Sequence, residues 1–160
     1  MAFGIPLGLR RLAALAMLIL AAGCAGSFPP RFQETAAQAA PVPAGSARIF
    51  VYREYEPYEG AGRPYVSLNG ERIGIAEPGG AIYRDVAPGT YRVTVASYAV
   101  WPFPPPPLTV KAGEVRYIKI GSLQTWASCG TMSRFTFVPM PVGEGQGQRE
   151  VAGSWFYGGP

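Results

Sequence analysis

The chain has 160 residues, including 21 Gly and 17 Pro, and its formal net charge at pH 7 is +4. It contains no histidine, so it lacks the commonest general base and the commonest zinc ligand, and we expect no cofactor, no metal and no histidine-activated nucleophile. The basic residues form no cluster, which excludes the electrostatic footprint of a nucleic-acid-binding protein.

The first 24 residues have the pattern of a bacterial lipoprotein export signal. Two arginines precede an apolar run that is too short to cross a ~30 Å hydrocarbon layer as a permanent helix, and small residues then lead to Cys24. Residues 1–23 are therefore predicted to be a signal peptide, cleaved between Gly23 and Cys24 once the thiol carries a diacylglyceryl group. The pattern resembles the lipobox, with Ala21 where leucine is usual.

Two alternatives for this segment stay open: an ordinary secretory peptide cut near Ala22, or an unmodified thiol at Cys24. The paired arginines hint at a twin-arginine signal, but their neighbours do not complete that motif. Acyl chains on Cys24 would make membrane lipid the first partner, since each buried CH₂ contributes ~0.8 kcal/mol and two or three chains hold durably. No aspartate follows Cys24, which by resemblance to the sorting rule of enteric-type bacteria implies the outer membrane, facing the periplasm.

Residues 24–46 are predicted to be a flexible tether. They are rich in Ala, Pro, Gly and Gln and poor in β-branched residues, so they bury too little apolar surface to offset the loss of chain entropy. A short helix around Glu34 to Ala40 is compatible with this composition.

The pattern over residues 47–140 is that of short strands separated by turns. Residues 48–52 place apolar side chains on both faces of a strand, which suggests partial cover on both sides. Asn69 and Gly70 lie between two short strand patterns and predict a type I′ hairpin, because both residues accept positive φ angles. Further strands are predicted at 65–68, 71–75, 81–86, 90–97, 108–110, 115–120 and 134–138.

Seven to eight short strands with turns at this spacing predict an all-β fold, a small antiparallel β-sandwich of the prealbumin or Ig type. Beyond it, residues 141–160 are rich in Gly and Gln. We expect a flexible C-terminal tail there, in which the aromatics at 155–157 form either an edge strand or a sticky end.

Three phrases resemble a known family. They are Ala-Arg-Ile-Phe-Val-Tyr-Arg, then Val-Ser-Leu-Asn-Gly-Glu-Arg-Ile-Gly followed by Gly-Gly-Ala-Ile-Tyr-Arg-Asp-Val-Ala-Pro-Gly-Thr-Tyr-Arg-Val-Thr-Val, and later Val-Lys-Ala-Gly-Glu-Val-Arg-Tyr-Ile-Lys-Ile. In this order they resemble the bacterial lipoproteins with a domain of unknown function 2846 (DUF2846), and more loosely PEGA-like and prealbumin-like β-sandwiches. The resemblance covers about residues 47 to 140 and implies an extracytoplasmic, non-enzymatic sandwich. The proline run at 102–107 and the segment Thr125 to Ser133 depart from it.

Aromatic residues supply the candidate binding surface. Tyrosines interleaved with Glu and Arg can stack on sugar rings, as in an envelope glycan, and a proline run flanked by aromatics can form a stiff polyproline II strip for an envelope protein. Each has a structural alternative: tyrosines that cover the sandwich edge, and a rigid crossover between strands. The candidate residues are Tyr52, Tyr55, Tyr58, Tyr65, Trp101 and Phe103.

Two features leave an enzyme open as an alternative. Cys129 has only Arg134 near it in sequence, so we expect a buried or loop thiol, or an intermolecular disulfide, rather than a nucleophile. Carboxylates would indicate a cell-wall-acting enzyme if they converged in a pocket, and a binding module if they were dispersed. The carboxylates in question are Glu54, Glu56, Glu59, Glu71, Glu77 and Asp85.

The expected function is therefore that of a non-enzymatic, lipid-anchored cell-envelope lipoprotein whose β-sandwich is a binding or structural module. The alternatives are the cell-wall-acting enzyme and an accessory lipoprotein of an envelope secretion or adhesion system.

Overall fold

A computed structural model of the chain describes residues 28–35, 41–57, 62–96, 104–126 and 133–159. Several sequence predictions therefore lie outside the described residues: the signal peptide with Gly23 and Cys24, and the side chains of Tyr58, Trp101, Phe103, Glu59 and Cys129.

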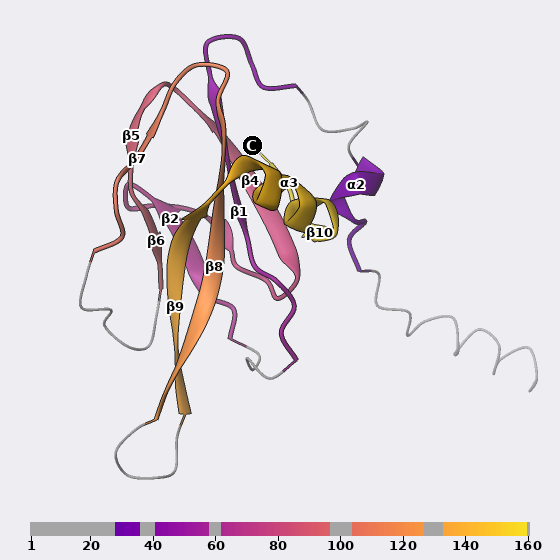
Figure 1. The fold of residues 1–160 in the computed structure, drawn as a ribbon, viewed down its shortest axis with the longest axis vertical. Coiled ribbons are helices and arrows are strands. Elements are labelled where there is room, and N and C mark those ends of the chain that lie inside the picture. Colours follow the sequence, from indigo (N-terminus) through magenta and orange to yellow (C-terminus); the bar gives the residue numbers. More distant parts are fainter. Residues whose placement is uncertain (1–27, 36–40, 58–61, 97–103, 127–132, 160) are drawn as a thin grey trace, which may run out of the picture.

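The described residues form ten strands and two helices (Figure 1). The first strands are β1 (Ala47–Tyr52), β2 (Tyr65–Leu68), β3 (Glu71–Ile75), β4 (Gly80–Val86) and β5 (Gly89–Tyr91). The remaining strands are β6 (Val93–Val95), β7 (Leu108–Val110), β8 (Val115–Trp126), β9 (Ser133–Val142) and β10 (Trp155–Phe156). The helices are α2 (Phe32–Thr35) and α3 (Glu144–Ala152), and within the described ranges no helix is long and apolar enough to cross a bilayer.

The strands form a five-stranded sheet in the order β10-β4-β1-β8-β9, a three-stranded sheet β3-β2-β6 and the pair β5-β7. The prediction of a small all-β sandwich is confirmed. Most neighbouring strands are antiparallel, as expected, but β1 pairs with β8 in parallel and β10 pairs with β4 in parallel. The central strand β1 thus lies between one antiparallel and one parallel neighbour.

Both faces of β1 are covered, and more completely than the partial cover that its sequence predicts, since every residue of the strand is buried. Ile49 and Val51 lie in a first core that also takes residues from the three-stranded sheet, such as Val66. Phe50 and Tyr52 point to the opposite face and lie in a second core. We call these the first core and the second core. The members of the second core are Phe50, Tyr52, Ala81, Tyr83, Tyr117 and Val151, with Phe32, Val115, Val142 and Phe156 packed against them.

The hairpin between β2 and β3 has the predicted turn. Asn69 and Gly70 have φ angles of 49° and 88°, which is the positive-φ pair that a type I′ turn requires. The Asn69 side chain also accepts a hydrogen bond from the backbone N–H of Arg92 at 2.8 Å. The turn is therefore tied to the segment that leads into the neighbouring strand β6.

The prediction of a flexible tail over residues 141–160 is wrong. The segment completes β9, forms helix α3 and ends with β10 paired to β4. Helix α3 lies close on the sheet because it presents Gly147 there: a Cβ atom at this position would lie 2.2 Å from Cγ of Tyr117. Val151, one turn later, is 1% exposed in the second core. Burial of one face, rather than helix propensity, stabilises this segment.

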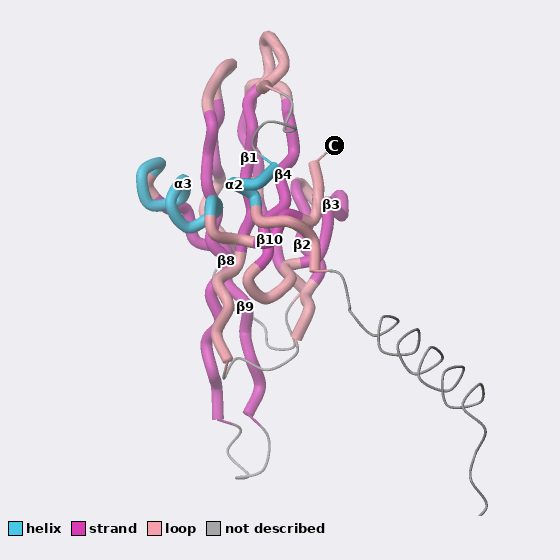
Figure 2. The backbone as a smooth tube through the Cα atoms, turned by 90° about the vertical axis from the view of Figure 1, so that its right-hand side faces the viewer, coloured by secondary structure: helices cyan, strands magenta, loops and turns pink. Residues whose placement is uncertain are grey.

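The prediction of a flexible tether over 24–46 is wrong for residues 28–35. Figure 2 shows α2 lying beside β10 and the body of the fold. The Phe32 ring packs on Phe50 and Phe156, with ring centres 5.2 and 5.4 Å apart. The backbone N–H of Phe156 also donates to the carbonyl of Pro30 at 2.9 Å. The short helix begins at Phe32, earlier than the composition suggested, because its aromatic side chain is buried against the second core.

The β8–β9 hairpin is longer than predicted. Its register runs from Tyr117 opposite Val142 to Trp126 opposite Ser133, whereas β1 pairs only with the first part of β8, up to Lys119. The rest of the hairpin extends as a two-stranded ribbon away from α2 and α3, as both views show (Figures 1 and 2).

Candidate functional site

Tyr52 does not belong to an exposed binding surface, so that part of the prediction is wrong. Its side chain is 1% exposed, and its hydroxyl donates a hydrogen bond to Oε2 of Glu150 at 2.7 Å. Burial, together with this hydrogen bond and the negative charge of Glu150, raises the pKa of Tyr52 far above its usual value. The cause of the difference is α3, which covers the face of β1 to which Tyr52 points.

Tyr55 and Tyr65 are exposed, as expected for a binding surface, with 62% and 42% of their area accessible. They have different neighbours. The Tyr55 ring contacts Trp155 edge-on at 6.3 Å between ring centres, and the Tyr65 ring lies under the guanidinium of Arg72 at 3.6 Å. The two tyrosines therefore belong to two separate contacts.

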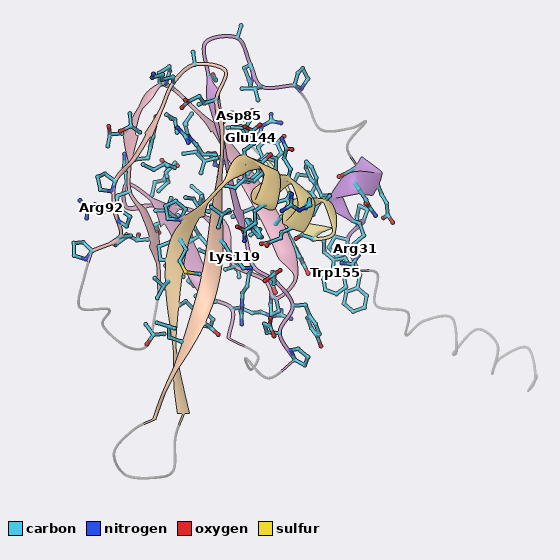
Figure 3. All side chains as sticks on the ribbon, in the orientation of Figure 1. Arg31, Asp85, Arg92, Lys119, Glu144 and Trp155 are labelled. Atoms are coloured by element: carbon cyan, nitrogen blue, oxygen red, sulfur yellow. The ribbon has the colours of Figure 1, made fainter. Side chains whose placement is uncertain are left out.

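Tyr55 is part of a cluster that the sequence did not indicate, which we call the aromatic patch: Phe28, Arg31, Tyr55 and Trp155. Phe28 is 73% exposed and stacks on Trp155, with ring centres 5.2 Å apart and planes 20° apart. The guanidinium of Arg31 lies 4.2 Å from the centre of the Trp155 ring and also donates to the carbonyl of Gly153. Arg31 and Trp155 lie side by side next to α2 and β10 in Figure 3.

The patch was missed because two of its three segments were predicted to be flexible. Phe28 and Arg31 fall in the predicted tether, and Trp155 in the predicted tail. The available signal was the run of aromatics at 155–157, which was interpreted as an edge strand or a sticky end and is in fact both paired and partly exposed.

A second polar cluster surrounds Lys119, which is labelled in Figure 3. Its ammonium group forms ion pairs with Glu54 and, at 3.1 Å, with Oε2 of Glu150. Burial alone would lower the pKa of Lys119, but hydrogen bonds to the two carboxylates outweigh it and raise the pKa. Burial alone would likewise raise the pKa of Glu150, but hydrogen bonds from Tyr52, Gln146 and Lys119 lower it. The one ammonium group engages both carboxylates, so the cluster joins α3 to β8.

A groove of about 280 Å³ lies where β3 faces β4 and the last residues of the chain. Its lining is largely apolar, with one carboxylate and two tyrosines. The lining residues are Ile73, Gly74, Ile75, Glu77, Ile82, Tyr83, Tyr157, Gly158 and Gly159. Two of its glycines permit close approach: a Cβ atom on Gly74 would lie 2.6 Å from Cδ1 of Ile82, and one on Gly159 would lie 2.2 Å from Cζ of Tyr83.

The polar end of this groove is formed by Glu77 and Tyr157. Oε2 of Glu77 forms an ion pair with Nε of Arg63 at 3.0 Å, and the Arg63 side chain is 66% exposed. Burial, followed by the negative charge of Glu77, raises the pKa of Tyr157, and Arg63 opposes this shift. The arrangement can hold a ligand with an apolar face and a hydrogen-bonding end.

A second hollow, of about 350 Å³, is polar and lies between the turn before β8 and the junction of β9 with α3. Glu114 in its wall accepts a hydrogen bond from the backbone N–H of Lys111 at 2.8 Å, which together with Arg116 lowers the pKa of Glu114. These contacts close the turn at Gly113, whose φ is 79°. The carboxylate of Glu114 therefore has a structural role in this turn.

Of the carboxylates that the sequence singled out, the five that the structure describes, all except Glu59, do not converge. Asp85 pairs with Arg48, Glu77 with Arg63 and Glu54 with Lys119, each on a different part of the fold. Glu71 and Glu56 are exposed, Glu71 beside the β2–β3 turn and Glu56 in the loop after β1. Within the described ranges, no group of three or more Cys, Asp or Glu side chains is placed to hold a metal ion.

One comparison with known proteins gives a match. A family model described as "Protein of unknown function (DUF2846)" matches residues 43–130, which is more than half of the chain. No curated protein and no solved structure matches.

Proposed function

The chain belongs to the DUF2846 family, and from this premise we propose that it is a lipid-anchored cell-envelope protein whose β-sandwich is a non-enzymatic binding or structural module. The observation that carries the proposal is the sequence pattern that ends at Cys24, with its basic start, short apolar run and small residues before the thiol. Acyl chains on Cys24 hold the mature protein on the membrane, and the absence of a following aspartate favours the outer membrane, with the domain facing the periplasm.

The dispersed carboxylates support a module rather than an enzyme. Hydrolysis of a glycan by paired carboxylates needs two of them at one glycosidic bond, whereas Asp85, Glu77 and Glu54 each pair with a different basic residue. These pairs stabilise the fold at three separate places.

The groove beside β3 is the candidate ligand site of this module. Its walls are apolar, and the carboxylate of Glu77 with the hydroxyl of Tyr157 supplies hydrogen-bonding groups at one end. The ligand class that fits is a partner segment or a glycan with an apolar face and a hydrogen-bond donor directed at Glu77.

The anchor is tested with Cys24→Ser in cells fed radioactive palmitate. A hydroxyl does not accept the diacylglyceryl group, so we expect the variant to lose the label and to leave the membrane fraction or remain unprocessed. Cys129→Ser is the matched control, because it makes the same chemical change at the other cysteine and keeps label and membrane fraction. A Cys24→Ser protein that is labelled and processed like the wild type contradicts the proposal.

A further inference from the structure

The aromatic patch is held on the rigid body of the domain. Arg31 and Trp155 form an antiparallel β-bridge, and the backbone N–H of Phe32 donates to the carbonyl of Ser154 at 2.8 Å. The Phe32 side chain then packs edge-on against Phe50 of the second core, with ring centres 5.2 Å apart. The segment that carries Phe28 and Arg31 is thus fixed to β10 immediately before α2.

This attachment shortens the link between Cys24 and the domain. Only four residue steps separate Cys24 from Phe28, and a fully extended chain spans at most about 3.5 Å per residue, so the backbone of Phe28, the first residue of the patch, lies within about 14 Å of the Cys24 backbone. A tether that reached to Ala47, as the composition predicts, would have allowed roughly 80 Å. An acylated Cys24 therefore keeps Phe28 close to the bilayer surface.

The side chains of the patch suit the membrane–water interface. Trp and Tyr are enriched there because an apolar ring and a polar edge match the headgroup region, and a guanidinium can donate to phosphate oxygens. Phe28 and Tyr55 are the two most exposed large apolar or aromatic side chains among the described residues, at 73% and 62%. Both contact Trp155, which lies beside Arg31 in Figure 3, so they belong to the side of the domain that carries α2 and β10.

We propose that the aromatic patch is a membrane-contact surface: Phe28, Tyr55 and Trp155 rest in the headgroup region of the phospholipid bilayer that holds the Cys24 acyl chains, with Arg31 at the phosphates. This inference rests on the proposed lipid anchor. It fixes the orientation of the domain, with the α2–β10 side against the membrane and the β8–β9 ribbon away from α2.

The charges near the patch indicate that burial of the rings, not attraction to anionic lipid, provides the contact. Glu34 accepts a hydrogen bond from the backbone N–H of Arg31 at 2.9 Å, and Glu54 is paired with Lys119. Glu56 next to Tyr55 is exposed. Two cations, Arg31 and the paired Lys119, beside three carboxylates give no polybasic surface, so the contact forms on neutral phosphatidylcholine.

The test uses the full acylated protein, purified from membranes and reconstituted into phosphatidylcholine vesicles with or without bromine atoms near the top of the acyl chains. Bromine quenches tryptophan fluorescence only at short range. The signal of Trp155 is obtained as the difference between the wild type and Trp155→Phe, since the chain also contains Trp101 and Trp126. We expect the bromolipid to remove most of the Trp155 fluorescence and to affect Trp155→Phe less.

A double variant, Phe28→Ser with Tyr55→Ser, assigns the contact to these side chains, and we expect it to lose most of the quenching while it still floats with the vesicles. Leu123→Ser is the matched control, because Leu123 is 44% exposed on the β8–β9 ribbon, away from α2. It keeps the wild-type quenching. If the patch binds a glycan instead of the bilayer, Trp155 stays in water and the bromolipid does not quench it in the wild type.

Three results separate the two proposals. Wild-type protein that floats with the vesicles but shows no quenching of Trp155 overturns the membrane contact and leaves the anchor intact. Quenching that persists in the double variant overturns the role of Phe28 and Tyr55. Protein that carries no acyl chain and does not float contradicts the anchor on which the inference rests.

Discussion

Arg48 and Asp85 lie directly opposite each other in the β1–β4 ladder, and the guanidinium donates from Nε and Nη2 to the two carboxylate oxygens at 2.6 and 2.8 Å. Their side chains are only 6% and 10% exposed. The guanidinium also lies 3.9 Å from the centre of the Tyr83 ring. The hydrogen bond to Asp85 raises the pKa of Arg48, against the opposing effect of burial. The pair therefore joins two central strands on the side of the second core.

Removal of one partner is expected to be costly. Asp85→Ala leaves a nearly buried guanidinium without its carboxylate, so we expect it to lower the free energy of unfolding by about 3 kcal/mol. The double variant Arg48→Met with Asp85→Leu removes both charges and should recover most of this loss. Urea unfolding followed by circular dichroism measures both. A double variant no more stable than the single one would show that the charge pair itself stabilises the ladder.

Alanine substitutions at Gly147 and Gly145, in the same helix, are expected to have opposite effects on stability. Alanine normally stabilises a helix relative to glycine by up to about 1 kcal/mol, and Gly145→Ala should do so because its Cβ would meet only Nη1 of Arg149 at 3.6 Å. Gly147→Ala would instead collide with the Tyr117 ring at 2.2 Å and should destabilise the protein. Thermal unfolding of the two variants checks this. Equal stabilisation by both would mean that α3 does not pack on Tyr117 as described.

Gly70 is expected to be required for its backbone conformation alone. Its φ is 88°, and nothing lies within 4 Å of an added Cβ atom. Gly70→Ala should therefore cost about 1–2 kcal/mol of stability from backbone strain, whereas Gly70→Asn should cost less, because Asn tolerates positive φ better. Denaturant midpoints of the two variants give the comparison. An alanine variant as stable as the asparagine variant would contradict a type I′ turn.

Glu150 is expected to contribute to the loss of stability in acid. Its pKa in the folded protein lies below the usual value of 4.5, so its ionised form stabilises the fold above that pH and the contribution is lost as the pH falls through the folded-state pKa. Glu150→Gln should be less stable than the wild type at pH 7 and should lose less stability below pH 4.5. Urea unfolding across this pH range measures the slope. A Glu150→Gln slope equal to that of the wild type would contradict the role of Glu150.

Local patterns predicted the local structure well. The Asn69–Gly70 turn was readable because its positive φ angles depend on two adjacent residues. The alternation of side chains in β1 could also be predicted from neighbouring residues alone, and it indicated cover on both faces. Neither inference required knowledge of distant partners.

The second core was not predicted because its covering segments look flexible in isolation. Gly147 weakens a helix by propensity, and its value is apparent only when the Tyr117 ring lies against it. Residues 28–35 likewise gain their order from Phe32, which packs on Phe50 and Phe156. The error at Tyr52 follows directly: the sequence predicted only partial cover for this face of β1, without α3, and Tyr52 was therefore assigned to an exposed surface.

The parallel pairing of β1 with β8 has a kinetic consequence. Arg48 meets Val115 and Tyr52 meets Lys119, so the central strand finds this neighbour only after most of the chain is available. Edge strand β10 closes on β4 later still in chain order. Contacts between residues so far apart in sequence slow folding, and a chain that emerges gradually from its N-terminus forms the β1–β4 ladder first and the β1–β8 ladder only late in synthesis. Such delay suits the export that we propose for this chain, in which it would cross a membrane unfolded before it folds on the other side.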